Sequence, residues 1–229
     1  MTVTTMPTAS IPGHRGRFIT LEGGEGAGKS TQLRRLAETL REALRARGLE
    51  LVTTREPGGS PGAEEIRGLL VTGETGRWSP VTEALLHTAA RRDHLERTVW
   101  PALEAGNWVL CDRFFDSTMA YQGYGLGLGR ELVETLQTAA LGGFRPDLTL
   151  ILDIDVETGL RRAVARHGGE DRYERMDIGF HQRLRDGFLD IARREPERCA
   201  VVDADADLDT VQARIRDAVA GRLGLELTP

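Results

Sequence analysis

The stretch RFITLEGGEGAGKST, residues 17–31, decides the fold of this chain. Residues 17–23 alternate and then run apolar, which is typical of a buried strand. The next residues match the pattern Gly-x-x-x-x-Gly-Lys-Ser, whose glycines let successive backbone N–H groups turn inward around phosphates. Leucines at helical spacing follow from Ser30, so the positive end of a helix dipole points at the same phosphates. Strand, loop and helix together predict a nucleotide-binding loop.

Lys29 is the only lysine among the 229 residues. The motif predicts that Lys29 bridges the β- and γ-phosphates of ATP and that the Ser30 hydroxyl binds Mg²⁺. A GTP-binding switch protein would need an Asn-Lys-x-Asp segment, which is impossible here because the single lysine lies in the loop. The pattern therefore favours a small kinase that also binds a second, anionic substrate. The residues expected to bind ATP are Gly23, Gly24, Glu25, Gly26, Ala27, Gly28, Lys29, Ser30 and Thr31.

Composition argues against several classes of partner. The formal net charge of −5 leaves no broad basic face for a nucleic acid or an anionic membrane. No apolar run reaches the roughly 18 residues that a membrane-spanning helix requires. Cys111 and Cys199 fit neither a metal-binding spacing nor a disulfide framework, as in a reducing cytosol. We therefore expect a cytoplasmic protein with neither nucleic-acid nor membrane partners.

The rest of the sequence alternates between strand and helix patterns. Residues 1–16 are small, polar and proline-bearing, and we expect a disordered leader there. A single domain is expected over residues 17–225. Strands that alternate with helices predict an α/β fold of three layers, in which helices cover both faces of a five-stranded parallel sheet. The expected strands are residues 17–23, 49–56, 107–113, 148–155 and 199–204.

The longest expected helix starts at Ser79 and Pro80, a capping serine followed by a proline. It is expected to run to about Leu103, with a bend at Pro101. The turn-rich residues PGGSPG at 57–62 predict a loop. The other expected helices cover residues 30–47, 115–123, 130–141 and 157–166, a stretch that ends near 194, and one that begins at 207.

Arginines lie where an acceptor phosphate would bind. Ligands of open parallel sheets bind at the carboxyl ends of the strands, and Arg55 and Arg113 each end an expected strand. Arg91 and His87 lie four residues apart, on one face of the long helix. Because guanidinium groups bind phosphates in a planar, bidentate way, converging arginines suit a monophosphate as acceptor.

Five linked motifs strengthen this interpretation: GGEGAGKST, TREPGGS, LLHTAARRDH, CDRFFDSTMAYQG and the arginine-bearing segment after LDIDVETGLRRA. With these motifs in this order, the chain resembles bacterial thymidylate kinase from residue 17 to about 220. The resemblance implies a P-loop nucleoside monophosphate kinase fold and transfer of the γ-phosphoryl group of ATP to dTMP, with Mg²⁺, commonly by a homodimer. Two alternatives stay open, a kinase for another nucleotide or nucleoside and a regulatory protein that binds ATP.

The resemblance also implies roles for single residues. Arg113 would bind the dTMP phosphate with Arg55 nearby, and Arg91 would meet the thymine edge. Asp112 would either lie near Mg²⁺ with Ser30 or orient Arg113. The remaining implied dTMP contacts are Glu25 at the sugar 3′-hydroxyl, Tyr121 at the sugar 2′ position, and Ser117, Thr118 and Gln122 at or beside the base.

His87 departs from the family pattern, which usually has a phenylalanine that stacks on the base. An imidazole can stack, but with less apolar area and with a charge that varies near neutral pH. The alternative is an ordinary, partly exposed histidine.

A lid over about residues 161–177 is the other implied feature. Some family members place an arginine in the phosphate loop where this chain has Gly26, so we expect the missing charge to come from the lid. Arg166 and Arg172 flank HGGED and are the arginines expected to enter the site on closure. The other lid arginines are Arg161, Arg162 and Arg175.

Overall fold

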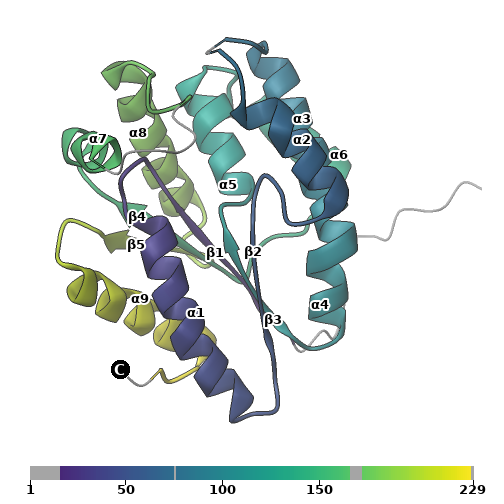
Figure 1. Ribbon diagram of the computed structural model, residues 1–229, viewed down its shortest axis with the longest axis vertical. Coiled ribbons are helices and arrows are strands. Elements are labelled where there is room, and N and C mark those ends of the chain that lie inside the picture. Colours follow the sequence, from purple (N-terminus) through teal and green to yellow (C-terminus); the bar gives the residue numbers. More distant parts are fainter. Residues whose placement is uncertain (1–15, 75, 166–171, 228–229) are drawn as a thin grey trace, which may run out of the picture.

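A computed structural model describes residues 16–74, 76–165 and 172–227, and all of the predicted leader 1–16 except Gly16 lies outside them. The described chain forms one parallel sheet of five strands in the order β2-β3-β1-β4-β5, which confirms the predicted fold class. Helices cover both faces of the sheet (Figure 1). The strands are β1 (Phe18–Gly23), β2 (Leu51–Arg55), β3 (Trp108–Asp112), β4 (Leu148–Asp153) and β5 (Cys199–Asp203).

β1 is the central strand and carries the phosphate loop at its end. All six of its residues are buried, as expected for a parallel strand covered on both faces. It pairs with β3 on one side and with β4 on the other, so that Leu21 lies opposite Asp112 and Leu150. The connection from β3 to β4 crosses from one half of the sheet to the other, past this strand. Its carboxyl end is therefore the position where open α/β sheets bind ligands.

Two apolar cores lie on the two faces of the sheet. On one face, leucines of α1 pack with Ile215 and Val219 of α9. On the other face, side chains of η1, α5, η2, α6 and α8 pack around Phe18 and Phe114. The helical elements are α1 (Lys29–Arg45), α2 (Pro61–Val71), α3 (Pro80–His94), η1 (Leu95–Val99), α4 (Trp100–Glu104), α5 (Phe115–Thr118), η2 (Met119–Gly125), α6 (Arg130–Leu141), α7 (Val156–Val164), α8 (Ile178–Arg194) and α9 (Leu208–Leu223).

Residues 57–62 are only partly the loop that the sequence predicted. The turn ends at Ser60, whose backbone is extended, and α2 begins at Pro61. Proline suits the first turn of a helix because its fixed φ is helical and no partner is needed for the missing N–H. The second Pro-Gly of PGGSPG therefore starts a helix, although it looks like a further turn in the sequence.

The long helix begins as predicted and is irregular near its end. The Ser79 hydroxyl caps it by accepting a hydrogen bond from the Thr82 amide at 3.2 Å. The helical path continues to Glu104 through the wide π-helical turn η1 instead of simply bending at Pro101. In a regular α-helix the Pro101 ring would collide with the carbonyl group of Arg97, and the wider turn relieves that contact.

Candidate active site

A cavity of about 240 Å³ opens at the carboxyl ends of β1, β2 and β3. Its walls come from the phosphate loop, the ends of β2 and β3, helices α2 and α3, the segment from α5 into η2, and Arg172 with Tyr173. Segments far apart in the sequence therefore share one space.

The phosphate loop forms the first wall and has the predicted geometry. Gly28, at φ 87°, precedes α1, which begins at Lys29. The Lys29 ammonium donates to the carbonyl oxygens of Gly23 at 2.9 Å and Gly24 at 2.7 Å. Burial, assisted by the neighbouring Arg113, lowers the pKa of Lys29 to about 8. The ammonium thus has two weak neutral partners that an anionic phosphate could replace.

Gly26 has no room for a side chain. Its φ is 68°, and a Cβ atom there would lie 1.8 Å from the carbonyl oxygen of Gly159 in α7. A Cβ atom on Gly159 would in turn lie 2.5 Å from the carbonyl oxygen of Glu25. The loop and α7 therefore touch backbone to backbone, which explains why the loop carries no arginine at this position.

Ser30 and Asp112 supply oxygen atoms between the loop and β3. The Ser30 hydroxyl donates to Asp112 Oδ2 at 3.4 Å, and both residues line the cavity. In residues 16–74, 76–165 and 172–227, no group of three or more His, Cys, Asp and Glu side chains could hold a metal ion. One or two protein oxygens completed by substrate phosphates are the usual Mg²⁺ site of a kinase, so these residues fit that ion.

Arg113 reaches the centre of the cavity from a strained backbone. It is the one non-glycine residue with a positive φ, 66°, in the part of the chain that the structure describes. Such a conformation costs on the order of 1–3 kcal/mol and is concentrated at functional sites. The guanidinium donates to Ser117 Oγ at 3.0 Å, to the Tyr121 hydroxyl at 2.9 Å and to Glu25 Oε1 at 3.4 Å. Arg113, the residue implied to bind the dTMP phosphate, thus contacts Tyr121 and Glu25, the residues implied to bind the sugar.

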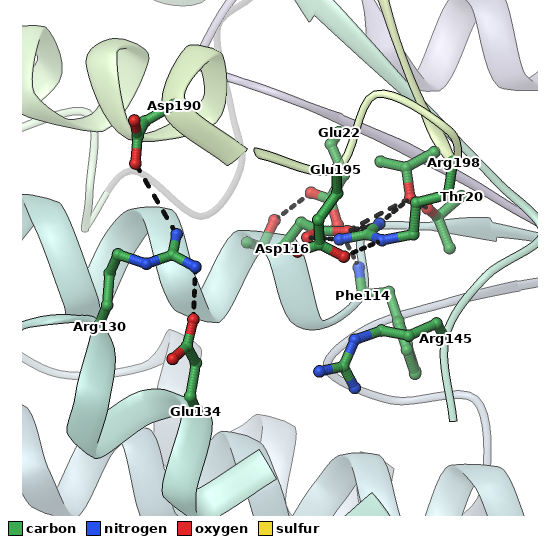
Figure 2. A network of polar contacts seen from close by, with 12 residues as sticks. Thr20, Glu22, Phe114, Asp116, Arg130, Glu134, Arg145, Asp190, Glu195 and Arg198 are labelled. Carbon is green, nitrogen blue, oxygen red and sulfur yellow. Dashed lines mark hydrogen bonds and ion pairs between the residues drawn. The ribbon is translucent and has the colours of Figure 1, made fainter. Parts of the chain in front are cut away.

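Buried carboxylates hold the turn that carries Arg113. Glu22, at 0% exposure, accepts from the Phe114 amide at 2.7 Å and from the Ser117 hydroxyl at 2.5 Å. Burial, with the nearby charge of Asp116, raises the pKa of Glu22 to about 8. Asp116 in turn pairs with Arg198 at 2.7 Å (Figure 2). Sequence analysis missed these residues, and the only signal was a carboxylate at position 22 inside an apolar strand.

The predicted base-binding residues also line the cavity. Arg91 is 3% exposed, and it donates to Glu56 Oε2 at 2.7 Å and to Thr118 Oγ1 at 3.0 Å. The exposed Arg55 pairs with Glu64 at 3.1 Å and still reaches the cavity wall. Arg67 also lines the cavity and was missed, because the sequence analysis assigned no helix to the residues that follow the loop predicted at 57–62.

His87 lies in the same wall, surrounded by cations. Burial lowers the pKa of His87 to about 3, and the charges of Arg91 and Arg172 lower it in the same direction. The ring is therefore neutral at physiological pH. The expected variation of its charge near neutral pH does not fit this surrounding, because burial first and the guanidinium groups second keep the imidazole unprotonated, and the sequence shows neither.

The predicted lid arginines separate in space. Arg166 lies outside the described residues. Arg172 is buried in the cavity wall, where its guanidinium binds Glu83 at 2.5 Å. Arg162 joins α7 to the loop after β5 by donating to Asp205 at 3.2 Å, and Arg161 bonds to Thr158 within its own helix.

Comparisons with known proteins agree with this geometry. The family model for thymidylate kinase matches residues 21–215. The chain is 60% identical to the thymidylate kinase of Caulobacter vibrioides over 92% of this chain and 99% of that protein. It is 54% identical to that of Ruegeria pomeroyi over 91% and 96% of the two chains. A crystal structure of thymidylate kinase from Ehrlichia chaffeensis superimposes with a TM-score of 0.73 at 34% identity, covering 89% of this chain and 98% of that one.

Proposed function

The chain belongs to the thymidylate kinase family and phosphorylates dTMP to dTDP, and we propose how the residues of its cavity carry out that transfer. One observation carries the proposal: Lys29 and Arg113 line the same cavity of about 240 Å³ from two different strand ends. A donor phosphate on the loop and an acceptor phosphate on Arg113 would therefore be neighbours. Such a geometry favours direct transfer of the phosphoryl group between the two substrates.

The donor end consists of the loop from Gly23 to Thr31. Its backbone N–H groups bind the ATP phosphates, and the Lys29 ammonium leaves the two carbonyl oxygens for the β- and γ-phosphates. Ser30 and Asp112 would hold Mg²⁺, which supplies positive charge to the phosphates when it is bound. Asp112 stays available for this, because its carboxylate accepts from the Ser30 hydroxyl, whereas the Arg113 guanidinium donates to Ser117, Tyr121 and Glu25.

The acceptor end consists of side chains from several elements. Arg113 and Arg55 bind the dTMP phosphate, and Glu25 and Tyr121 contact the sugar. The hydroxyl of Tyr121 donates to Glu25, so each fixes the other before the sugar arrives. The base contacts are Arg91, Ser117, Thr118 and Gln122.

His87 stacks on the thymine ring in this proposal. A neutral imidazole suits this position, because a cation there would lie among the arginines that already line the wall. We expect His87→Phe to keep or tighten dTMP binding and His87→Ala to weaken it, as measured by titration calorimetry. Equal affinity in the wild type and both variants would remove stacking from the proposal.

Arg166 supplies charge to the transferring phosphoryl group. The proposal is supported by the backbone contact between Gly26 and Gly159, which leaves no space for an arginine in the loop itself. We expect Arg166→Ala to lower kcat much more than it raises the KM for dTMP. Wild-type turnover in this variant would contradict the assignment. Arg172 is already bound to Glu83, so the donor-side charge is not assigned to it.

An acceptor panel tests the proposed substrate site. ATP is incubated with dTMP, dUMP, dCMP, dAMP or dGMP in turn, and ADP release is followed. We expect dTMP to give the highest kcat/KM. Equal rates with all five monophosphates would contradict the base contacts, and ADP release that does not depend on any acceptor would contradict the acceptor site as a whole.

We also propose that the protein works as a cytoplasmic homodimer. Large apolar side chains are exposed on α3 and on the two helices beside it: Val81 and Leu85 on α3, Leu69 on α2, and Leu132 on α6. Light scattering on a sizing column should give twice the chain mass, and Leu85→Glu should give a monomer. A monomeric wild type would refute the dimer. None of the described helices is long and apolar enough to cross a membrane.

A further inference from the structure

Glu83 is a buried carboxylate behind the acceptor end of the cavity. It lies on α3, one turn before His87, and is 1% exposed. Its Oε2 atom accepts from Arg172 at 2.5 Å, and its Oε1 atom accepts from the Gln122 amide at 2.8 Å and from the Tyr173 hydroxyl. All three donors line the cavity, whereas Glu83 does not. One carboxylate therefore fixes three wall residues at once.

Arg172 extends this wall from α3 to α2. Its Nη1 atom donates to the carbonyl oxygen of Leu70 at 2.9 Å, near the end of α2, where helix carbonyl groups lack a partner in their own helix. Its guanidinium lies 5.4 Å from the centre of the Tyr173 ring. Leu70 also lines the cavity. The guanidinium thus ties together two helices and the aromatic ring beside them.

The charges of Glu83 and Arg172 make this arrangement stable before any ligand binds. A buried guanidinium or carboxylate without its partner is strongly unfavourable, so each requires the other. Side chains that are already ordered cost a ligand little entropy when it binds. The wall is therefore already ordered before a ligand binds, and the acceptor meets a preformed surface.

We propose that Glu83 and Arg172 are a positioning pair for the acceptor: Glu83 holds Arg172, Tyr173 and Gln122 in the wall against which dTMP packs. Arg172 then acts on acceptor binding and not on the transferring phosphoryl group. The inference rests on the proposed acceptor site. The sequence suggested a different role for Arg172 and none for Glu83.

Binding of dTMP in the absence of ATP is the test. Titration calorimetry with dTMP is performed on the wild type, Glu83→Gln, Arg172→Met and the double variant. We expect each single variant to raise the Kd at least tenfold. The double variant should bind about as weakly as the weaker single variant, because the two side chains act as one unit. At saturating dTMP, kcat should stay within about threefold of the wild type.

Arg130→Met is the matched control. Arg130 bonds to the hydroxyl of Tyr124 at 3.2 Å and pairs with Asp190 at 3.9 Å and with Glu134 (Figure 2). Tyr124 also donates to Asp190, so this is a second cluster of arginine, carboxylate and tyrosine, and none of its members lines the cavity. The control variant should lose thermal stability while its Kd for dTMP stays within twofold of the wild type.

Three results would overturn the inference. The first is an unchanged Kd in folded Glu83→Gln and Arg172→Met. The second is a tenfold lower kcat at saturating dTMP with an unchanged Kd, which would assign Arg172 to the phosphoryl group. The third result comes from Tyr173→Phe, which removes one hydroxyl only and is used if both variants unfold. This variant should raise the Kd for dTMP about threefold. A wild-type Kd for dTMP in Tyr173→Phe would contradict the positioning pair. If the wild type itself fails to bind dTMP, the proposed acceptor site is wrong instead.

Discussion

The two ends of the cavity are built in different ways. The proposed donor end is one continuous loop, which would bind ATP through backbone N–H groups and Lys29 and whose glycine at position 26 packs against α7. The proposed acceptor end is assembled from β2, β3, α3, η2 and residues beyond 171, and buried carboxylates hold two of its arginines, Arg91 and Arg172. The donor end is thus determined locally, whereas the acceptor end exists only after the chain has folded.

Lys29→Met should have the largest effect and separate the two ends most sharply. Without the ammonium, the charge on the transferring group is less stabilised, so kcat should fall about a thousandfold. Because dTMP is held by other residues, its Kd should change by less than about threefold. A coupled ADP-release assay gives kcat and calorimetry gives the Kd. An equally large loss of dTMP binding would mean that the ends are not separable.

Arg113→Met is the converse change at the acceptor end. Removing a guanidinium that binds a phosphate should weaken dTMP binding by about a hundredfold. The affinity for ATP alone should stay close to that of the wild type, which equilibrium binding of a fluorescent ATP analogue can measure. Weak ATP binding in this variant, with dTMP binding intact, would reverse the assignment of the two ends.

Gly159→Ala tests the backbone contact that holds the donor end. The added Cβ would lie 2.5 Å from the carbonyl oxygen of Glu25, so the loop or α7 must shift. We expect kcat/KM for ATP to fall about tenfold, since small displacements of bound phosphates are costly. Gly221→Ala in α9 meets nothing within 4 Å and is the control. Wild-type kinetics in both variants would mean that the contact does not position the loop.

His87→Phe should have the smallest effect, visible in the pH dependence of stability. The pKa of His87 is about 3 in the folded chain against 6.5 ordinarily, so the unfolded chain binds a proton that the folded chain does not bind. The stability due to the neutral ring is present above pH 6.5 and is lost as the pH falls through the window from 6.5 to 3.

Urea denaturation at pH 7.5 and pH 5 measures this loss. The wild type should lose about 2 kcal/mol more than His87→Phe between these two pH values, because a phenylalanine does not titrate. The same loss in both proteins would place the proton uptake on another group.

The difference between the two ends also explains what the sequence could predict. The donor loop was predicted residue by residue, because inward N–H groups require glycines at fixed spacing. Arg55 and Arg113 were predicted to converge, since the carboxyl ends of neighbouring parallel strands meet. Glu22 and Glu83 were not found, because a buried carboxylate is defined by its partners, and those partners lie far away in the sequence.

Arg172 illustrates the same limit. Its position among glycines and charges indicated a lid arginine that enters the site on closure, whereas the folded chain already buries it against α2 and α3. The start of α2 was hidden for a related reason, because a Pro-Gly pair is compatible with both a turn and a helix start.

The central claim is that one cavity holds donor and acceptor together, so that the phosphoryl group passes directly from ATP to dTMP. ATP made chiral at the γ-phosphorus with oxygen isotopes tests this claim, with the configuration of the β-phosphorus read in the dTDP product. A single direct transfer inverts the configuration, and inversion is the predicted result. Retention would require two successive transfers through a phosphorylated side chain and would contradict the account.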